Sequence, residues 1–284
     1  MKLGFNTWCI APDMSFAENL EILSKIGYTD IEITLDEKVK GHGSFTLESS
    51  DQDILAMREL VEAKGMRISS IATSMNRGQM GSADPELREE AKTILRKQLK
   101  AAKLCGATHV LTVPGGDQDY SLQMAFEQSI KTIKELLPEI EASGVKIAVE
   151  NVWNSFFMSP YDVERFLDAI NHASCGMYFD VGNMLEWSTA ESWLEILGHS
   201  IIGVHLKDYQ SNVEGQRFVG GDRVPIGQGD CHWDRVIPQL LEIPYNGAWI
   251  IESYKPEDPN LSYETFFQEI YNTLHKMVKK AQTE

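Results

Sequence analysis

The chain has 284 residues, which is long for one ordinary domain but suits an α/β barrel of roughly 250 residues. Lys and Arg total 26 against 42 Asp and Glu, which gives a net charge of −16. This charge argues against nucleic acid as a partner, because a phosphate backbone requires a basic surface. No apolar run approaches the ~20 residues of a membrane-spanning helix, so we expect no membrane partner either.

The cysteines indicate a reducing compartment. Four of them are scattered along the chain without a C-x-x-C pair, at Cys9, Cys105, Cys175 and Cys231. We interpret them as reduced thiols that pack as small apolar groups. Residues 3–10 are too short and too polar for a signal peptide. A cytoplasmic location is therefore expected.

The first half of the chain alternates between short apolar segments and helical periodicity. We expect strands at residues 2–7, 30–34, 67–73 and 109–113. Four helices should follow them, and glycines mark where these end: Gly27, Gly65, Gly106 and Gly144. Asp84 and Pro85 form a typical helix start. Residues 36–50 and 74–84 show little apolar periodicity and are predicted to be loops.

The second half contains four strands with a shared pattern. Each is an apolar run that ends on or next to a residue able to bind a metal, and the four residues are Glu150, Asp180, His205 and Glu252. Helices are expected near 160–170, 190–197, 233–241 and 263–278. Eight strands that alternate with eight helices predict a parallel sheet closed into a single (β/α)₈ TIM barrel over residues 1–284. An open doubly wound sheet is less favoured, because the first strand–helix turn lacks G-x-G-x-x-G.

Strand alternation predicts where these side chains point. Residues i and i+2 share a face, so Ala148 and Glu150 face one way while Ile147 and Val149 face the helices. The same rule places Lys207 on the face of His205. All four candidate ligands should thus enter the barrel at the C-terminal ends of the strands, where barrel active sites lie.

A single carboxylate at a strand end is most often a helix cap or half of a salt bridge, and a single His is most often a core residue. Three buried carboxylates that converge need a cation, because they would otherwise repel at great cost. The set therefore predicts one divalent metal ion. Three oxygen donors with one imidazole favour Mn²⁺, Mg²⁺ or Co²⁺, and Zn²⁺ is also compatible.

Several segments resemble a known family. The stretches "IAVENVWN", "YFDVGNMLEW", "VHLKD", "VPIGQGD" and "WIIESY" are similar to the xylose isomerase-like TIM-barrel sugar and sugar-phosphate isomerases and epimerases. They lie nearest the L-xylulose-5-phosphate 3-epimerase (hexulose-phosphate isomerase-like) branch. The resemblance implies that Glu150, Asp180, His205 and Glu252 bind the metal, and that Glu150 and Glu252 are also the catalytic acid–base pair. The metal would polarise a ketose carbonyl and stabilise the enediolate, while one Glu removes the C3 proton and the other returns one to the opposite face.

Other residues are candidates for binding the sugar or sugar phosphate. Lys207 would steady the enediolate or a phosphate, or else form an interior salt bridge with Glu150 or Asp180. Arg217 and Arg223 lie in the predicted long loop 209–230, where barrels often hold phosphate, or else are solvated charges. Strand-end candidates for the wall of the sugar pocket are Asn6, Trp8 and Trp153, with packing as the alternative role.

Asn183 is a further candidate for binding the substrate, and it also bears on which substrate that is. Free-ketose 3-epimerases typically have His three residues after the Asp ligand, so Asn183 favours the phosphate-sugar branch. The apurinic-site endonucleases share the barrel, but Asn183 and Val224 stand where that family has His, which disfavours DNA repair. Two alternatives stay open: an inosose-type dehydratase on the same metal site, and a non-catalytic sugar-binding barrel. The resemblance also implies a homodimer or homotetramer.

Overall fold

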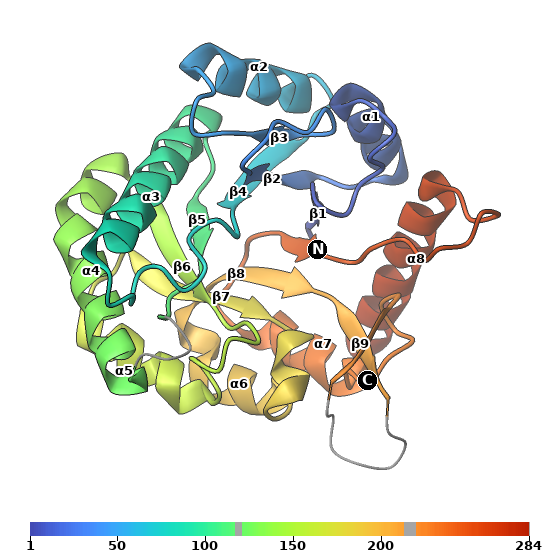
Figure 1. The fold of residues 1–284 in the computed structure, drawn as a ribbon. Helices are drawn as coiled ribbons and strands as arrows, with labels where there is room; N and C mark the ends of the chain where they lie inside the picture. The colour runs from blue at the N-terminus through green and yellow to red at the C-terminus, as the bar shows by residue number, and fades with distance from the viewer. Residues whose placement is uncertain (117–120, 213–219, 284) are drawn as a thin grey trace.

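The computed structural model describes residues 1–116, 121–212 and 220–283, and its centre is a closed parallel β-barrel (Figure 1). The barrel closes because β1 pairs with both β2 and β11, with Gly4 opposite Asp30 on one side and Ile250 on the other. The predicted (β/α)₈ barrel is confirmed. Its strands are β1 (Leu3–Asn6), β2 (Asp30–Leu35), β4 (Arg67–Ala72), β5 (His109–Thr112), β6 (Lys146–Glu150), β7 (Cys175–Asp180), β8 (Ile201–Leu206) and β11 (Trp249–Ile251).

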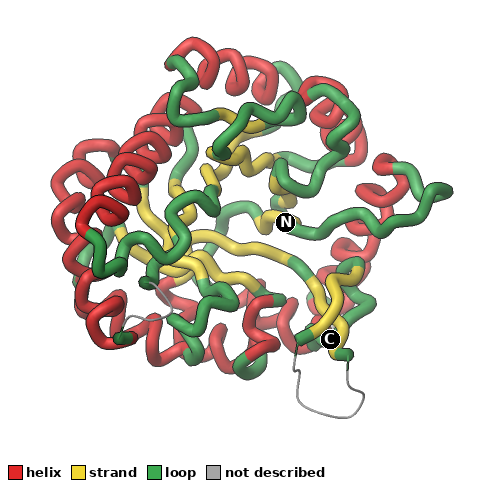
Figure 2. Tube along the Cα trace, viewed as in Figure 1, coloured by secondary structure: helices red, strands yellow, loops and turns green. Residues whose placement is uncertain are grey.

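Helices surround the barrel on its outside (Figure 2). The predicted glycine stops at Gly27, Gly106 and Gly144 are confirmed, since each adopts the left-handed conformation that ends a helix. Among the described residues no helix is long and apolar enough to cross a membrane. The helices are α1 (Phe16–Ile26), α2 (Asp51–Glu62), α3 (Pro85–Cys105), α4 (Leu122–Ser143), α5 (Pro160–Ile170), α6 (Ala190–Leu197), α7 (Trp233–Glu242) and α8 (Tyr263–Ala281).

Two segments predicted to be loops contain strands. Within residues 36–50, β3 (Ser44–Phe45) adds to the edge of β2, with Ser44 opposite Thr34. Within the predicted loop after the seventh barrel strand, β9 (Asp208–Ser211) and β10 (Gly221–Val224) form an antiparallel pair. The loop prediction was wrong at both places, because strands of two to four residues are too short to show a hydrophobic period.

Two separate apolar layers lie on either side of the barrel wall. In β6, Ile147 and Val149 belong to the large core under the helices, whereas Ala148 packs with Tyr178 in a small cluster inside the barrel. The predicted alternation is therefore confirmed. The interior cluster is small because polar side chains fill much of the same space. These buried polar groups lie below the candidate active site.

Gly203 in β8 permits this tight interior packing. A Cβ at this position would lie 2.7 Å from ring carbons of Tyr178 and 2.8 Å from Nε2 of His109. We expect Gly203→Ala to lower the free energy of unfolding by about 1–3 kcal/mol, because the Tyr178 ring has no room to move. The matched control is Gly41→Ala, where a Cβ meets nothing within 4 Å. Equal urea midpoints for the two variants would contradict the prediction.

Candidate active site

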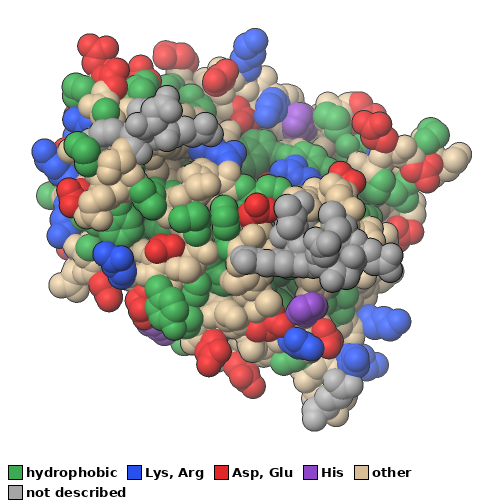
Figure 3. All heavy atoms as spheres, turned by 60° about the horizontal axis from the view of Figure 1, so that its bottom comes forward, with side chains coloured by type: hydrophobic (Ala, Val, Ile, Leu, Met, Phe, Trp, Pro, Cys, Tyr) green, Lys and Arg blue, Asp and Glu red, His purple; other side chains and the backbone are tan. Residues whose placement is uncertain are grey.

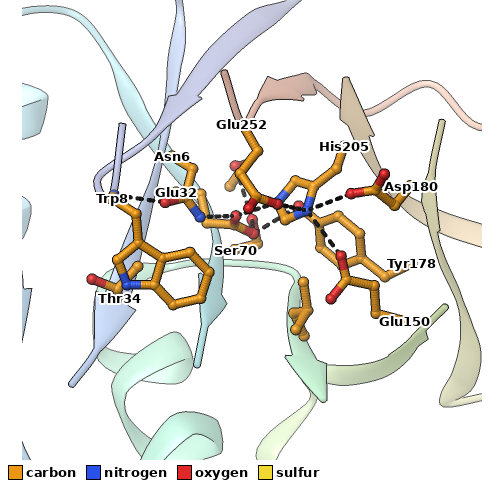
Figure 4. A network of polar contacts seen from close by, with 12 residues as sticks. Asn6, Trp8, Glu32, Thr34, Ser70, Glu150, Tyr178, Asp180, His205 and Glu252 are labelled. Carbon is orange, nitrogen blue, oxygen red and sulfur yellow. Dashed lines mark hydrogen bonds and ion pairs between the residues drawn. The ribbon is translucent and has the colours of Figure 1, made fainter. Parts of the chain in front are cut away.

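The four predicted metal-binding residues meet at one mouth of the barrel (Figure 4). One ligand atom from each of Glu150, Asp180, His205 and Glu252 lies within 4.8 Å of all the others, and all four residues are buried. The strand register brings them together: Asp180 is opposite His205, and His205 is opposite Ile250, two residues before Glu252. Because parallel strands end at the same edge, local sequence and register are sufficient to assemble the cluster.

The two ring nitrogens of His205 face in different directions. Its Nδ1 faces three carboxylates, at 3.1 Å from Glu252 Oε2, 3.3 Å from Glu150 Oε1 and 3.7 Å from Asp180 Oδ2. Its Nε2 points away from them and lies 2.6 Å from Oε1 of Glu32. Nδ1 is therefore the nitrogen that could bind a metal ion.

Lys207 also enters the barrel, as strand alternation predicts. Its Nζ lies 2.8 Å from Asp180 Oδ2 and 3.0 Å from Glu252 Oε2. Of the two predicted salt-bridge partners, the structure shows Asp180 and adds Glu252, while no contact with Glu150 is seen in the described residues. Lys207 also lines the cavity above the site, so an ion pair and a substrate contact are both open to it.

Burial and the neighbouring charges shift these groups in different directions. Burial raises the pKa of Glu150 to about 7. Burial acts on Glu252 in the same way, but the charges of Lys207 and His205 outweigh it and lower the pKa of that carboxyl. For His205, burial favours the neutral ring, and the surrounding acidic groups nevertheless raise its pKa. The two glutamates that face the cavity thus differ in their affinity for a proton.

The donor set fits a divalent ion. Metal–oxygen and metal–nitrogen distances of about 2.0–2.3 Å keep any two ligand atoms within roughly 4.6 Å of each other. The four ligand atoms here lie within 4.8 Å of one another, which is close to that limit. Asp180 Oδ2 is buried and lies 2.8 Å from Lys207 Nζ, an ion pair, but within the described residues it accepts no hydrogen bond. A cation held by three carboxylates and an imidazole would compensate charges that are otherwise costly to bury.

A cavity of about 570 Å³ opens above the cluster, large enough for a small sugar phosphate. Most of the residues predicted to bind substrate line it, namely Trp8, Trp153, Asn183, Lys207 and Arg223, together with Glu150 and Glu252. Asn6 does not line it: its side chain is fully buried and donates to Glu32 at 2.7 Å. Arg217 lies outside the described residues.

Asn183 connects the metal cluster with the cavity wall. Its backbone N–H donates to Asp180 Oδ1 at 2.9 Å, and its side-chain amide donates to the Asn151 carbonyl at 2.7 Å. The indole N–H of Trp153 donates to the Asn183 carbonyl at 3.0 Å, and the Trp153 ring packs against Tyr209. Trp153 and Asn183 are therefore fixed in place as parts of the pocket.

The sequence pattern missed Lys40 and Arg77, which line the same cavity from the loops after β2 and β4. Lys40 forms an ion pair with Asp36 at 3.1 Å, and both cations are exposed. Figure 3 shows blue Lys and Arg side chains beside a green-lined hollow on this face. Charge counts over the whole chain could not reveal this local cationic rim, because the chain as a whole is acidic.

Asp208 is the last residue of the segment "VHLKD", and the sequence pattern predicts no role for it. Its carboxylate accepts hydrogen bonds from the backbone of Gly227 at 2.9 Å and Gly229 at 3.0 Å, and from the Trp233 indole at 2.8 Å. A Cβ at position 229 would lie 2.4 Å from Asp208 Oδ1. The segments "VHLKD" and "VPIGQGD" are thus tied together by one buried carboxylate, which fixes the end of β8 next to Lys207.

The chain is similar to known proteins over nearly its whole length. The chain is 26% identical over 268 residues to the putative L-ribulose-5-phosphate 3-epimerase SgbU of Escherichia coli (strain K12), covering 92% of each chain. The crystal structure of the IOLI protein with a bound zinc atom has a TM-score of 0.80 at 23% identity, covering 99% of each chain. A D-tagatose 3-epimerase-like protein has a TM-score of 0.77 at 20% identity and the same coverage. The family model described as xylose isomerase-like TIM barrel matches residues 20–269. The protein belongs to the xylose isomerase-like TIM barrel family.

Proposed function

We propose that the protein is a divalent-metal-dependent 3-epimerase of a ketose phosphate. One observation carries the proposal: Glu150 and Glu252 belong to the metal cluster and also line the cavity. They lie at the ends of β6 and β11, which are separated in the barrel by β7 and β8. Figure 4 shows their carboxyl groups approaching the cluster from different sides. Two carboxylates on different sides of a bound sugar can exchange protons with its two faces.

The chemistry at C3 needs these two groups in separate roles. A bound divalent ion would supply a Lewis acid that polarises the ketose carbonyl and makes the neighbouring C3 proton more acidic. One glutamate carboxylate takes this proton, and the other carboxyl group delivers a proton to the opposite face, which inverts the centre. In the reverse direction the two groups exchange roles. Lys207 holds the Glu252 carboxylate in place through its 3.0 Å contact.

The choice of a phosphorylated substrate rests on the charge around the cavity. Besides Lys207, which pairs with the cluster, three cations line its walls in a protein of net charge −16: Lys40, Arg77 and Arg223. Arg223 lies over the Tyr254 ring, with its guanidinium carbon 4.7 Å from the ring centroid, and donates from Nε to the Tyr209 hydroxyl at 3.3 Å. The name of the SgbU relative supports L-ribulose 5-phosphate as the first substrate to test. A cytoplasmic location and a homo-oligomeric state stay predictions.

The decisive experiment follows the C3 proton. Purified protein with Mn²⁺ and L-ribulose 5-phosphate in D₂O should incorporate deuterium at C3 and form L-xylulose 5-phosphate, both visible by NMR. Loss of water from the sugar or from an inosose would instead support the dehydratase alternative. No exchange across a panel of ketoses and their phosphates, with Mn²⁺ bound, would refute the epimerase and support a sugar-binding barrel.

The cations that line the cavity lead to a prediction about specificity. Arg77→Gln and Arg223→Gln should each raise KM for the ketose phosphate by about tenfold or more, because a charge-assisted hydrogen bond contributes roughly 1.5–3 kcal/mol. The value of kcat/KM for the unphosphorylated ketose should change little. Arg96→Gln is the control, since Arg96 pairs with Glu139 on the outer helices at 2.8 Å. Equal losses for both substrates would show that Arg77 and Arg223 do not bind phosphate.

A further inference from the structure

A carboxylate in the first half of the chain belongs to the polar interior of the barrel. Glu32 lies in the middle of β2 and is fully buried, and a charged group so deep requires hydrogen-bond partners. Its Oε1 accepts from Asn6 Nδ2 at 2.7 Å and contacts His205 Nε2 at 2.6 Å. Its Oε2 accepts from Ser70 Oγ at 2.6 Å and from the Tyr178 hydroxyl at 2.7 Å. Four different strands thus supply one partner each.

Glu32 is not a member of the metal cluster. The cluster that could hold an ion consists of three other carboxylates and His205. Glu32 lies on the opposite side of the imidazole, against Nε2, while Nδ1 faces the cluster (Figure 4). An ionised carboxylate can only accept, so a ring nitrogen 2.6 Å away must carry the hydrogen. Because Nε2 keeps its hydrogen on Glu32, Nδ1 is the nitrogen that gives up its hydrogen and offers its lone pair when an ion is bound.

We propose that Glu32 is a positioning residue of the metal centre, which fixes the tautomer and the rotation of His205 so that the Nδ1 lone pair points at the ion. This inference rests on the metal site of the proposed function and adds a residue from β2 to it. Carboxylates commonly hold the distal nitrogen of metal-binding histidines in this way. The contact joins residues 173 positions apart in the sequence.

The three remaining partners restrain Glu32 itself. One oxygen accepts a hydrogen bond from Asn6, and the other accepts from Ser70 and Tyr178. The carboxyl group therefore cannot rotate away without losing several hydrogen bonds. The Tyr178 ring also packs against the His205 ring, with centroids 4.4 Å apart. This arrangement leaves His205 a single orientation before any ion enters. It accounts for the burial of Asn6, which sequence reasoning had placed on the pocket wall.

The test measures metal binding rather than activity. Metal-free Glu32→Gln should bind Mn²⁺ about 10–100-fold more weakly than the wild-type protein in a calorimetric titration. Asp30→Asn is the matched control: Asp30 is a buried carboxylate of the same strand that pairs with Arg67 at 3.2 Å, and its loss should leave Mn²⁺ affinity unchanged. In the Zn²⁺-loaded protein, ¹⁵N NMR should show the proton on Nε2 of His205, and this signal should shift in Glu32→Gln.

A folded Glu32→Gln variant that binds Mn²⁺ within twofold of wild type, with an unchanged Nε2 signal, would overturn the proposal. If that variant does not fold, Ser70→Ala combined with Tyr178→Phe keeps both Glu32 and His205 but releases one carboxylate oxygen. This double variant should bind Mn²⁺ several-fold more weakly with a shifted Nε2 signal, and wild-type values for both would overturn the proposal. A wild-type protein that binds no Mn²⁺ would refute the metal-dependent function itself, which is a separate result.

Discussion

The Glu252→Gln variant is expected to lower kcat for epimerisation by about 10²–10⁴-fold, the usual contribution of a general acid or base. An amide can still occupy the position but cannot accept the C3 proton. Glu150→Gln should have an effect of the same order, because inversion requires both faces of the sugar. Kinetics at saturating Mn²⁺, with the metal content measured, separate this loss from weaker metal binding.

The two variants should also differ from each other in a diagnostic way. With one carboxylate left, each should still exchange the C3 proton of a single epimer with D₂O, and the two variants should act on opposite epimers. Glu257→Gln, at an exposed position after β11, is the control and should retain wild-type kcat. Exchange of the same epimer by both variants would contradict the assignment of one glutamate to each face.

Lys207→Met is expected to destabilise the metal-free protein by about 3–5 kcal/mol. The substitution leaves the buried carboxylates of Asp180 and Glu252 without their shared cation, and a buried ion pair that loses one partner costs about this much. Mn²⁺ should recover part of the loss, because an ion that binds the folded state restores positive charge between the carboxylates. Urea unfolding in EDTA and in Mn²⁺ measures both effects.

An exposed lysine provides the comparison. Lys131→Met on α4 should change the free energy of unfolding by no more than about 0.5 kcal/mol, with or without Mn²⁺. If Lys207→Met were as stable as Lys131→Met in EDTA, the lysine would not neutralise the cluster. If Mn²⁺ stabilised Lys207→Met less than it stabilises wild type, the ion would not take over the charge of the lysine.

Local pattern and one topological rule were sufficient for much of the site. Alternation in β6 separates Ala148 and Glu150 from the helix-facing Ile147 and Val149, and parallel strands bring their ends to the same edge. The cluster of Glu150 with residues on three later strands follows from these two facts alone. The same alternation correctly placed Lys207 inside the barrel.

Contacts between side chains on opposite sides of the barrel could not be predicted from strand alternation. Glu32 is an acid within an apolar strand, and the sequence contains this signal, but its partner is 173 residues away and depends on how the barrel closes. The choice of Asp180 and Glu252 as partners of Lys207 depends on side-chain positions that the strand pattern does not specify. The cationic rim of Lys40 and Arg77 comes from loops whose sequences have no hydrophobic periodicity, so the strand and helix patterns do not place it.

The closure of the barrel by β1 and β11 has a consequence for the order in which the protein is made. The last member of the metal cluster is Glu252, the residue after β11. His205 in turn contacts Glu32 on β2, and Glu32 accepts a hydrogen bond from Asn6 on β1. A nascent chain therefore cannot assemble the centre until the chain through Glu252 has left the ribosome. In the proposed metal-dependent enzyme, metal would therefore be loaded only after the barrel has closed.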